Sequence, residues 1–166
     1  MQAQERVEQA LAELGVAGEF RRFEQETRTA EDAAEAIGCE TGQVVKTLLF
    51  MAHGRPTLVL VPGDRVAQPG TLAKLLGVPR KRLKMGTPAE VAEHTGYSVG
   101  TVAPVGMPGR HDVVIDRGLA RFDKVWVSAG IERAMVCLDI GSLGRALGAQ
   151  WAEVAAPIEA EGGGAA

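Results

Sequence analysis

The sequence predicts an α+β domain built on a mixed, largely antiparallel sheet. Short strand-like segments outnumber helical ones along the 166 residues, and the helices are unevenly spread. The regular alternation of a doubly wound α/β fold is therefore missing. Two apolar segments, 44–52 and 56–61, flank a short turn at 53–55, which predicts a β-hairpin. We expect one domain over residues 1–156 and a disordered tail over residues 157–166, which is rich in glycine and alanine.

The elements before the hairpin are predicted from apolar residues at helical spacing and from glycines that end the helices. An apolar stripe over residues 7–14 predicts a first helix, which Gly15 ends. Residues 19–24 follow as an edge strand with exposed arginines. A second helix starts at Thr29, with an acidic residue three positions later as an imperfect capping box, and it stops at Gly38.

The elements after the hairpin begin with a turn at residues 62–64 (PGD). Residues 72–76 predict a short helix that a glycine ends. Thr87 then starts a stronger helix, because a proline occupies its first turn and Glu90 stands at the third position. This helix stops at Gly96.

The last third of the chain predicts mostly strands. Residues 112–115, 124–128 and 133–138 are short apolar segments of this kind. Residues 142–147 predict a short helix, and residues 151–154 a final strand.

Composition narrows the classes of function. The formal charge of −3 gives no general attraction to nucleic acid, so a polyanionic partner requires a local basic patch. Aromatic residues make up 4%, too few for an extended base-stacking platform. The two cysteines, Cys39 and Cys137, form no CxxC motif and indicate reduced thiols in a cytoplasmic protein. We find no apolar signal region and no segment of membrane-spanning length.

Several familiar chemistries have no motif in this chain. The sequence contains no GxSxG elbow, no Walker loop and no GxGxxG. The three histidines, His53, His94 and His111, form no HxxxH or His/Cys cluster, and we expect no metal ion. Each of them fits a surface histidine better than a ligand.

Lys46 is the most informative residue, because it interrupts the apolar segment 44–51 (VVKTLLFM). Such a segment predicts a strand buried on both faces, where an ammonium group requires a partner. The lysine is either structural, with its charge extended out of the core, or a cation at the floor of a pocket for an anionic or ester-bearing ligand.

Two further segments are candidates for the same pocket. The loop 96–109 is rich in glycine and proline, so it can present backbone N–H groups at fixed positions, as an oxyanion hole requires. It can equally be a plain connector. Residues 125–130 (VWVSAG) place a hydroxyl and a glycine at the end of an apolar strand. These two residues either line the mouth of a pocket or merely end the strand.

Together and in this order, these segments resemble the YbaK/EbsC family, the free-standing relatives of the editing domain inserted in bacterial prolyl-tRNA synthetases. The resemblance covers about residues 5–155 and includes the lysine strand and a GxxxP loop. The matching segments are 33–38 (AAEAIG), 44–49 (VVKTLL), 62–64 (PGD), 72–77 (LAKLLG), 95–100 (TGYSVG), 104–106 (PVG) and 127–130 (VSAG).

The resemblance implies a barrel-like mixed sheet with flanking helices, and hydrolysis of the ester that joins a wrong amino acid to the 3′ end of tRNA. It implies no cofactor, action in trans, the acceptor end of aminoacyl-tRNA as ligand, and prolyl-tRNA synthetase as a candidate partner. We expect a monomer or a homodimer. The implied water is activated by the ribose 2′-OH or, in some members, by a substrate thiol.

The resemblance also implies roles for individual residues. Lys46 would hold the terminal adenosine or the ester, and the backbone between Gly100 and Pro104 would bind the aminoacyl group and stabilise the oxyanion. The remaining residues implied to contact or support the substrate are Thr47, Tyr97, Thr101, Ser128, Gly130 and Phe23. We expect Lys46 to position the substrate rather than act as a nucleophile or base, since nothing nearby in sequence would clearly lower its pKa.

The basic cluster of Arg80, Lys81, Arg82 and Lys84 is a candidate for phosphate contacts on the acceptor stem, or else a solvated basic turn.

Departures from the family pattern concern the amino-acid pocket. Phe23 and Gln25 stand where many members carry tyrosine and histidine, and Thr101, Ala103 and Ala134 also differ. The edited amino acid therefore stays open among Ala, Cys, Ser and Thr, with tRNA-Pro as the expected carrier. Two alternatives to an enzyme stay open as well: a non-catalytic module that binds tRNA ends or a nucleotide, and a partner that docks on a synthetase.

Overall fold

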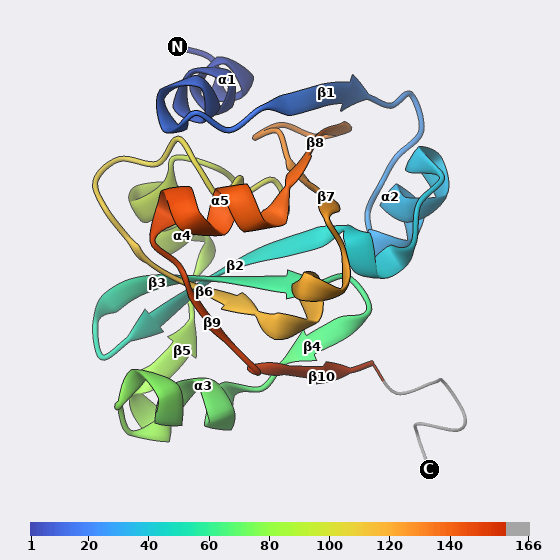
Figure 1. Cartoon of the computed structure of the whole chain (residues 1–166). Coiled ribbons are helices and arrows are strands. Elements are labelled where there is room, and N and C mark those ends of the chain that lie inside the picture. Colours follow the sequence, from blue (N-terminus) through green and yellow to red (C-terminus); the bar gives the residue numbers. More distant parts are fainter. Residues whose placement is uncertain (159–166) are drawn as a thin grey trace.

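The computed structural model describes residues 1–158 and contains three β-sheets (Figure 1). The central sheet has five strands in the order β5 (Leu83–Met85), β2 (Val45–Ala52), β3 (Arg55–Pro62), β6 (Asp112–Asp116) and β9 (Gln150–Ala152). β2 pairs antiparallel with both β3 and β5, whereas β3–β6 and β6–β9 are parallel. The predicted hairpin and the mixed character of the sheet are confirmed.

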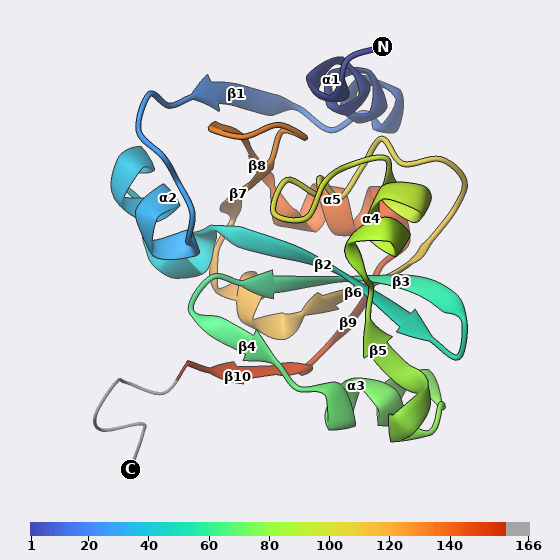
Figure 2. The same cartoon turned by 180° about the vertical axis from the view of Figure 1, so that it is seen from behind.

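The two smaller sheets are antiparallel throughout. One has the order β1 (Gly18–Arg22), β8 (Ala134–Asp139) and β7 (Lys124–Ser128), and the other pairs β10 (Ala155–Pro157) with β4 (Arg65–Ala67). Figures 1 and 2 show the three-stranded sheet at one end of the molecule and β4 with β10 at the other. The predicted α+β class with mostly antiparallel pairing is confirmed, and the strands form separate sheets rather than one closed barrel.

Five α-helices and three short 3₁₀ segments complete the described part of the chain. The helices are α1 (Ala3–Leu14), α2 (Ala30–Ile37), α3 (Pro69–Leu76), α4 (Pro88–Thr95) and α5 (Ile140–Leu147). The 3₁₀ segments are η1 (Thr41–Gln43), η2 (Arg80–Arg82) and η3 (Arg117–Arg121). No helix among residues 1–158 is long and apolar enough to span a membrane.

The predicted starts of α2 and α4 are confirmed, because a side chain caps each of them. The Thr29 hydroxyl accepts the N–H of Asp32 at 3.0 Å at the start of α2. Thr87 and Glu90 form a full capping box at the start of α4. Each of the five α-helices ends on a glycine in the left-handed conformation, which has no Cβ to oppose it.

Three strands were not predicted: β4, β5 and β10. Each has three residues, which is too short for a periodic pattern, and each is a strand only because a partner lies beside it. Residue 157, placed in the expected tail, belongs to β10, while residues 159–166 lie outside the described residues. The last predicted strand is shorter than expected and starts one residue earlier, at Gln150.

The core consists of two main apolar clusters on the two faces of β2 and β3. Val45 and Leu49 belong to one cluster, and Phe50 and Ala52 to the other. Because side chains alternate along a strand, Thr47 shares the face of Val45 and Leu49, and Lys46 leaves the opposite face. The expectation that this strand has an apolar layer on both sides is confirmed.

Candidate functional site

A cavity of about 900 Å³ runs along β2. Its wall combines segments that are far apart in sequence, and this arrangement brings the lysine strand, the glycine-rich loop and the end of β7 together. The segments are residues 26–31, 44–49, 85–86, 99–102 and 131–135, together with Ser128. The cavity borders both Lys46 and Thr47, whose side chains leave opposite faces of β2, so it extends around the edge of this strand.

Lys46 is half-buried at the cavity wall, and its ammonium group donates a hydrogen bond to the backbone carbonyl of Arg65. Burial lowers the pKa of Lys46 below its ordinary value of 10.5, and the nearby Asp64 carboxylate opposes this shift. The lowering comes from packing rather than from a neighbour in sequence, so no sequence pattern indicated it. An ammonium group has three donors, so two others remain for a ligand.

An ion pair fixes the turn beside Lys46. Two guanidinium nitrogens of Arg121 contact the two carboxylate oxygens of Asp64, at 2.9 and 3.0 Å. This pair lowers the pKa of Asp64 and keeps its carboxylate charged. The residue therefore stays a stable anion near the lysine.

A buried carboxylate holds the residue that accepts the lysine hydrogen bond. Asp116 has no exposed surface, and it contacts the guanidinium of Arg65 at 3.6 Å. One of its oxygens accepts the N–H groups of Val154 and Ala155, at 2.9 and 3.0 Å, and the other accepts the N–H of Gly118 at 2.9 Å. Asp116 thus ties the strand that carries Arg65 to the end of β6 and to β10. Sequence reasoning missed this role, since a single aspartate at a strand end has no distinguishing pattern.

The glycine-rich loop and the end of β7 are joined by a hydroxyl group. The Ser128 hydroxyl donates to the carbonyl of Thr101 at 2.9 Å and accepts the N–H of Gly130 at 3.0 Å. Gly100, Thr101 and Val102 border the cavity. Among residues 1–158, the N–H groups of Gly100 and Val102 have no acceptor.

Four of the residues implied to line the pocket do not border the cavity: Phe23, Tyr97, Pro104 and Gly130. Tyr97 is buried, and its hydroxyl donates to the carbonyl of Val105 at 2.6 Å. A Cβ added to Gly130 would lie 2.9 Å from the Tyr97 ring. Gly130 therefore packs against Tyr97, whose hydrogen bond to Val105 lies within the loop.

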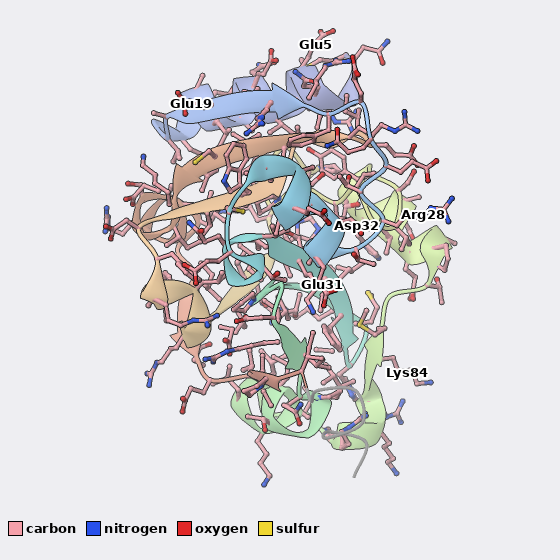
Figure 3. The ribbon with its side chains drawn as sticks, turned by 90° about the vertical axis from the view of Figure 1, so that its right-hand side faces the viewer. Glu5, Glu19, Arg28, Glu31, Asp32 and Lys84 are labelled. Carbon is pink, nitrogen blue, oxygen red and sulfur yellow. The ribbon has the colours of Figure 1, made fainter. Side chains whose placement is uncertain are left out.

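The basic cluster lies on η2 and β5, next to the cavity. Lys81, Arg82 and Lys84 border a second hollow of about 600 Å³, and the exposed Met85 borders both spaces. Arg80 is directed elsewhere, because its guanidinium donates to the carbonyl of Leu83 at 3.3 Å. Figure 3 shows Lys84 on the same side of the molecule as Arg28 and Glu31, which border the larger cavity.

The described residues bring no three His, Cys, Asp or Glu side chains together in a way that could hold a metal ion. The cavity wall itself contains no histidine and no cysteine among residues 1–158. The chemistry that the site offers is therefore backbone N–H donors, an ammonium group, carboxylates and hydroxyls.

Comparisons with known proteins point to one family. The sequence profile of the aminoacyl-tRNA editing domain matches residues 24–146. A proline–tRNA ligase of Nitratidesulfovibrio vulgaris (strain Hildenborough) is 36% identical over 118 residues, which are 71% of this chain but 19% of the ligase. The uncharacterized protein YwhH of Bacillus subtilis (strain 168) is 30% identical over 115 residues, 69% of this chain and 71% of that protein.

A solved structure has the same fold. The crystal structure of a candidate trans-editing enzyme for prolyl-tRNA synthetase superposes with a TM-score of 0.85 at 34% identity. The superposition covers 93% of this chain and 97% of that one.

Proposed function

The chain belongs to the aminoacyl-tRNA editing domain family, and on this premise we propose that it hydrolyses the ester bond of mischarged aminoacyl-tRNA in trans. The observation that carries the proposal is the meeting of Lys46 with the N–H groups of Gly100 and Val102 around one cavity. An ammonium group and N–H donors without another acceptor are groups that can stabilise the oxyanion of an ester under attack.

The proposed chemistry depends on positioning more than on a protein base. An aminoacyl ester is already activated, so orientation and oxyanion stabilisation supply much of the acceleration. Lys46 holds the ester or the terminal adenosine through the two N–H groups that Arg65 does not occupy. The ribose 2′-OH, or a thiol of the substrate, activates the water, as the family resemblance implies; the described cavity wall contains carboxylates but no histidine or cysteine.

The basic cluster is the proposed contact site for the phosphates of the acceptor stem. The net charge of the chain is −3, so phosphate contacts require a local concentration of positive charge. Lys81, Arg82 and Lys84 provide it beside Met85, at the border between the two hollows. The substrate that fits is a small amino acid (Ala, Cys, Ser or Thr) on tRNA-Pro, hydrolysed by a single domain over residues 1–156 in the cytoplasm, where tRNA is charged.

A panel of aminoacyl-tRNAs tests the proposal. We expect the wild-type protein to deacylate one or more of them, and Lys46→Ala to lose this activity while it keeps the fold. Lys74→Ala, an exposed lysine on α3, is the matched control and should keep full activity. Near-wild-type turnover by Lys46→Ala would contradict the assigned role. Binding of tRNA ends without hydrolysis would favour the non-catalytic module, and neither binding nor hydrolysis would favour a synthetase-docking protein.

Charge reversal at Lys81, Arg82 and Lys84 tests the route of the acceptor stem. We expect weaker tRNA binding and a smaller dependence of the binding constant on salt, because binding releases fewer counterions from the tRNA for each phosphate contact that is lost. An unchanged slope of binding against salt concentration would exclude the cluster from the interface.

A further inference from the structure

The pairing of β2 with β3 fixes where the backbone groups of Thr47 point. Proline has no N–H, so the residues opposite Pro56 and Pro62, which are Met51 and Val45, cannot form hydrogen-bonded pairs with them. Hydrogen-bonded and non-hydrogen-bonded pairs alternate along an antiparallel ladder. Thr47, two positions from Val45, is therefore also a non-hydrogen-bonded residue, and its N–H and C=O face away from β3.

No strand covers Thr47 on that other side within residues 1–158. At one end of the open stretch, the N–H of Gly86 donates to the carbonyl of Leu49 at 2.8 Å, which confirms the phase of the ladder. At the other end, Val44 forms a bridge with Trp126 of β7. In Figures 1 and 2, β7 approaches one end of β2 and β5 the other. The residues of β2 between them, 45–49, border the cavity.

The side chain of Thr47 adds a third unpaired polar group. Its hydroxyl oxygen is buried and has no hydrogen-bond partner, alone in this respect among the side chains of residues 1–158. A buried polar atom without a partner is unfavourable unless a ligand or water supplies one. Thr47 borders the cavity, so an N–H, a carbonyl and a buried hydroxyl without a partner in residues 1–158 lie together on one short stretch of open strand edge.

We propose that the open edge at Thr47 binds the free α-ammonium group of the aminoacyl ester, an inference that rests on the proposed function. The carbonyl and the hydroxyl oxygen of Thr47 are two acceptors for a group that carries several N–H donors. The Thr47 N–H stays available for an acceptor atom of the same aminoacyl group.

Two carboxylates of the cavity wall have no ion-pair partner in the described part of the chain and can balance the charge of a bound cation. Glu31 and Glu132 border the cavity and form no ion pair within residues 1–158, whereas Glu26 is shared between Arg28 and Arg133. An N-acylated ester carries no positive charge on its α-nitrogen and has a bulky carbonyl beside it. The site therefore selects free aminoacyl esters and rejects formylated, acetylated or peptidyl esters.

Stable analogues test this selection without hydrolysis. The probes are 3′-deoxy-3′-(L-alanylamino)adenosine, in which an amide replaces the ester, and its N-acetyl derivative. We expect the free-amine probe to bind about tenfold tighter or more by calorimetry, because hydrogen bonds to a charged group are the stronger ones. The free-amine probe should also shift the backbone amide resonance of Thr47. Equal affinities, or no binding of either probe, would overturn the inference.

Two variants separate the hydroxyl from the rest of the residue. Thr47→Val keeps the shape and the β-branch but removes the acceptor, and it should reduce the preference for the free amine by about tenfold. Thr47→Ser keeps the hydroxyl and should retain most of the preference. A preference that is undiminished in Thr47→Val contradicts a role for the hydroxyl.

Hydrolysis assays distinguish this inference from the proposed function. If alanyl-tRNA and N-acetyl-alanyl-tRNA are hydrolysed equally well, the deacylase assignment stands and the selection for a free amine is wrong. If no aminoacyl-tRNA in the panel is hydrolysed but the free-amine probe still binds preferentially, the deacylase assignment fails and the binding site at Thr47 stands.

Discussion

Replacement of Ser128 by alanine should uncouple the glycine-rich loop from the sheet. The serine hydroxyl bonds to Thr101 at 2.9 Å and to Gly130 at 3.0 Å. Each such bond contributes about 0.5–1.5 kcal/mol, so the variant should lose about 1–3 kcal/mol of unfolding free energy. For a domain of this size, that corresponds to a drop of roughly 3–10 °C in melting temperature.

The effect on catalysis should exceed this modest loss of stability. Loss of one oxyanion donor typically lowers the rate about 10²–10³-fold, and a loosened loop forfeits part of that stabilisation. We therefore expect kcat for deacylation to fall about tenfold to hundredfold at a temperature where Ser128→Ala stays folded. Ser128→Thr keeps the hydroxyl and should recover most of the rate.

A control variant that loses a hydrogen bond outside the cavity wall separates the effect on the loop from a general loss of stability. Asp139→Ala removes the side chain that accepts the N–H of Ser142 at 2.7 Å at the start of α5, and Asp139 does not border the cavity. This variant should also melt at a lower temperature but keep the wild-type kcat. Wild-type kcat in Ser128→Ala, with the expected drop in melting temperature, would refute the view that this hydroxyl aligns the loop for catalysis.

Three other predictions concern charge and packing around the cavity. Burial lowers the pKa of Lys46, so the lysine-dependent rate should fall at a lower pH than it would for an exposed lysine with a pKa of 10.5, and Lys46→Arg should extend activity to higher pH. Because the pKa of Lys46 is lower in the folded than in the unfolded state, its charged form destabilises the fold. The unfolding free energy should therefore rise as the pH increases from the folded pKa to the unfolded pKa. Asp116→Asn should lower the unfolding free energy by about 2–4 kcal/mol in urea titrations, because it removes a buried charge that accepts three backbone N–H groups. Gly63→Ala should cost about 1–3 kcal/mol by the same measurement, since its Cβ would lie 2.5 Å from the carbonyl oxygen of Thr41, whereas Gly70→Ala meets no atom within 4 Å and should be neutral or stabilising.

Much of the fold could be predicted because it is encoded by neighbouring residues. The cap at Thr87 and the hairpin over residues 44–61 depend on side chains within a few positions of each other, so spacing alone reveals them. The strands β4, β5 and β10 could not be predicted in this way. Their backbone hydrogen bonds go to partners that the tertiary fold supplies, and three residues are too few to show a period.

Some features of the candidate site are likewise visible in the sequence, and others only in the tertiary structure. The anomaly of Lys46 and the glycine-rich character of the loop are visible in the sequence, because a charge in an apolar run and a row of flexible residues are local facts. The family resemblance also implied that Tyr97 and Gly130 contact or support the substrate. In the structure they pack against each other and do not border the cavity, which local pattern could not show.

The sequence by itself determined that a cation lies in a buried strand and that a glycine-rich loop and a serine accompany it. The tertiary structure alone decided that burial lowers the pKa of Lys46, and that Asp116 holds the residue that accepts its hydrogen bond. It alone decided that Thr47 lies on an open strand edge, since this depends on where β5 and β7 stop alongside β2. The reason is physical: burial and hydrogen-bond satisfaction depend on which distant segments pack together, and no run of neighbouring residues encodes that.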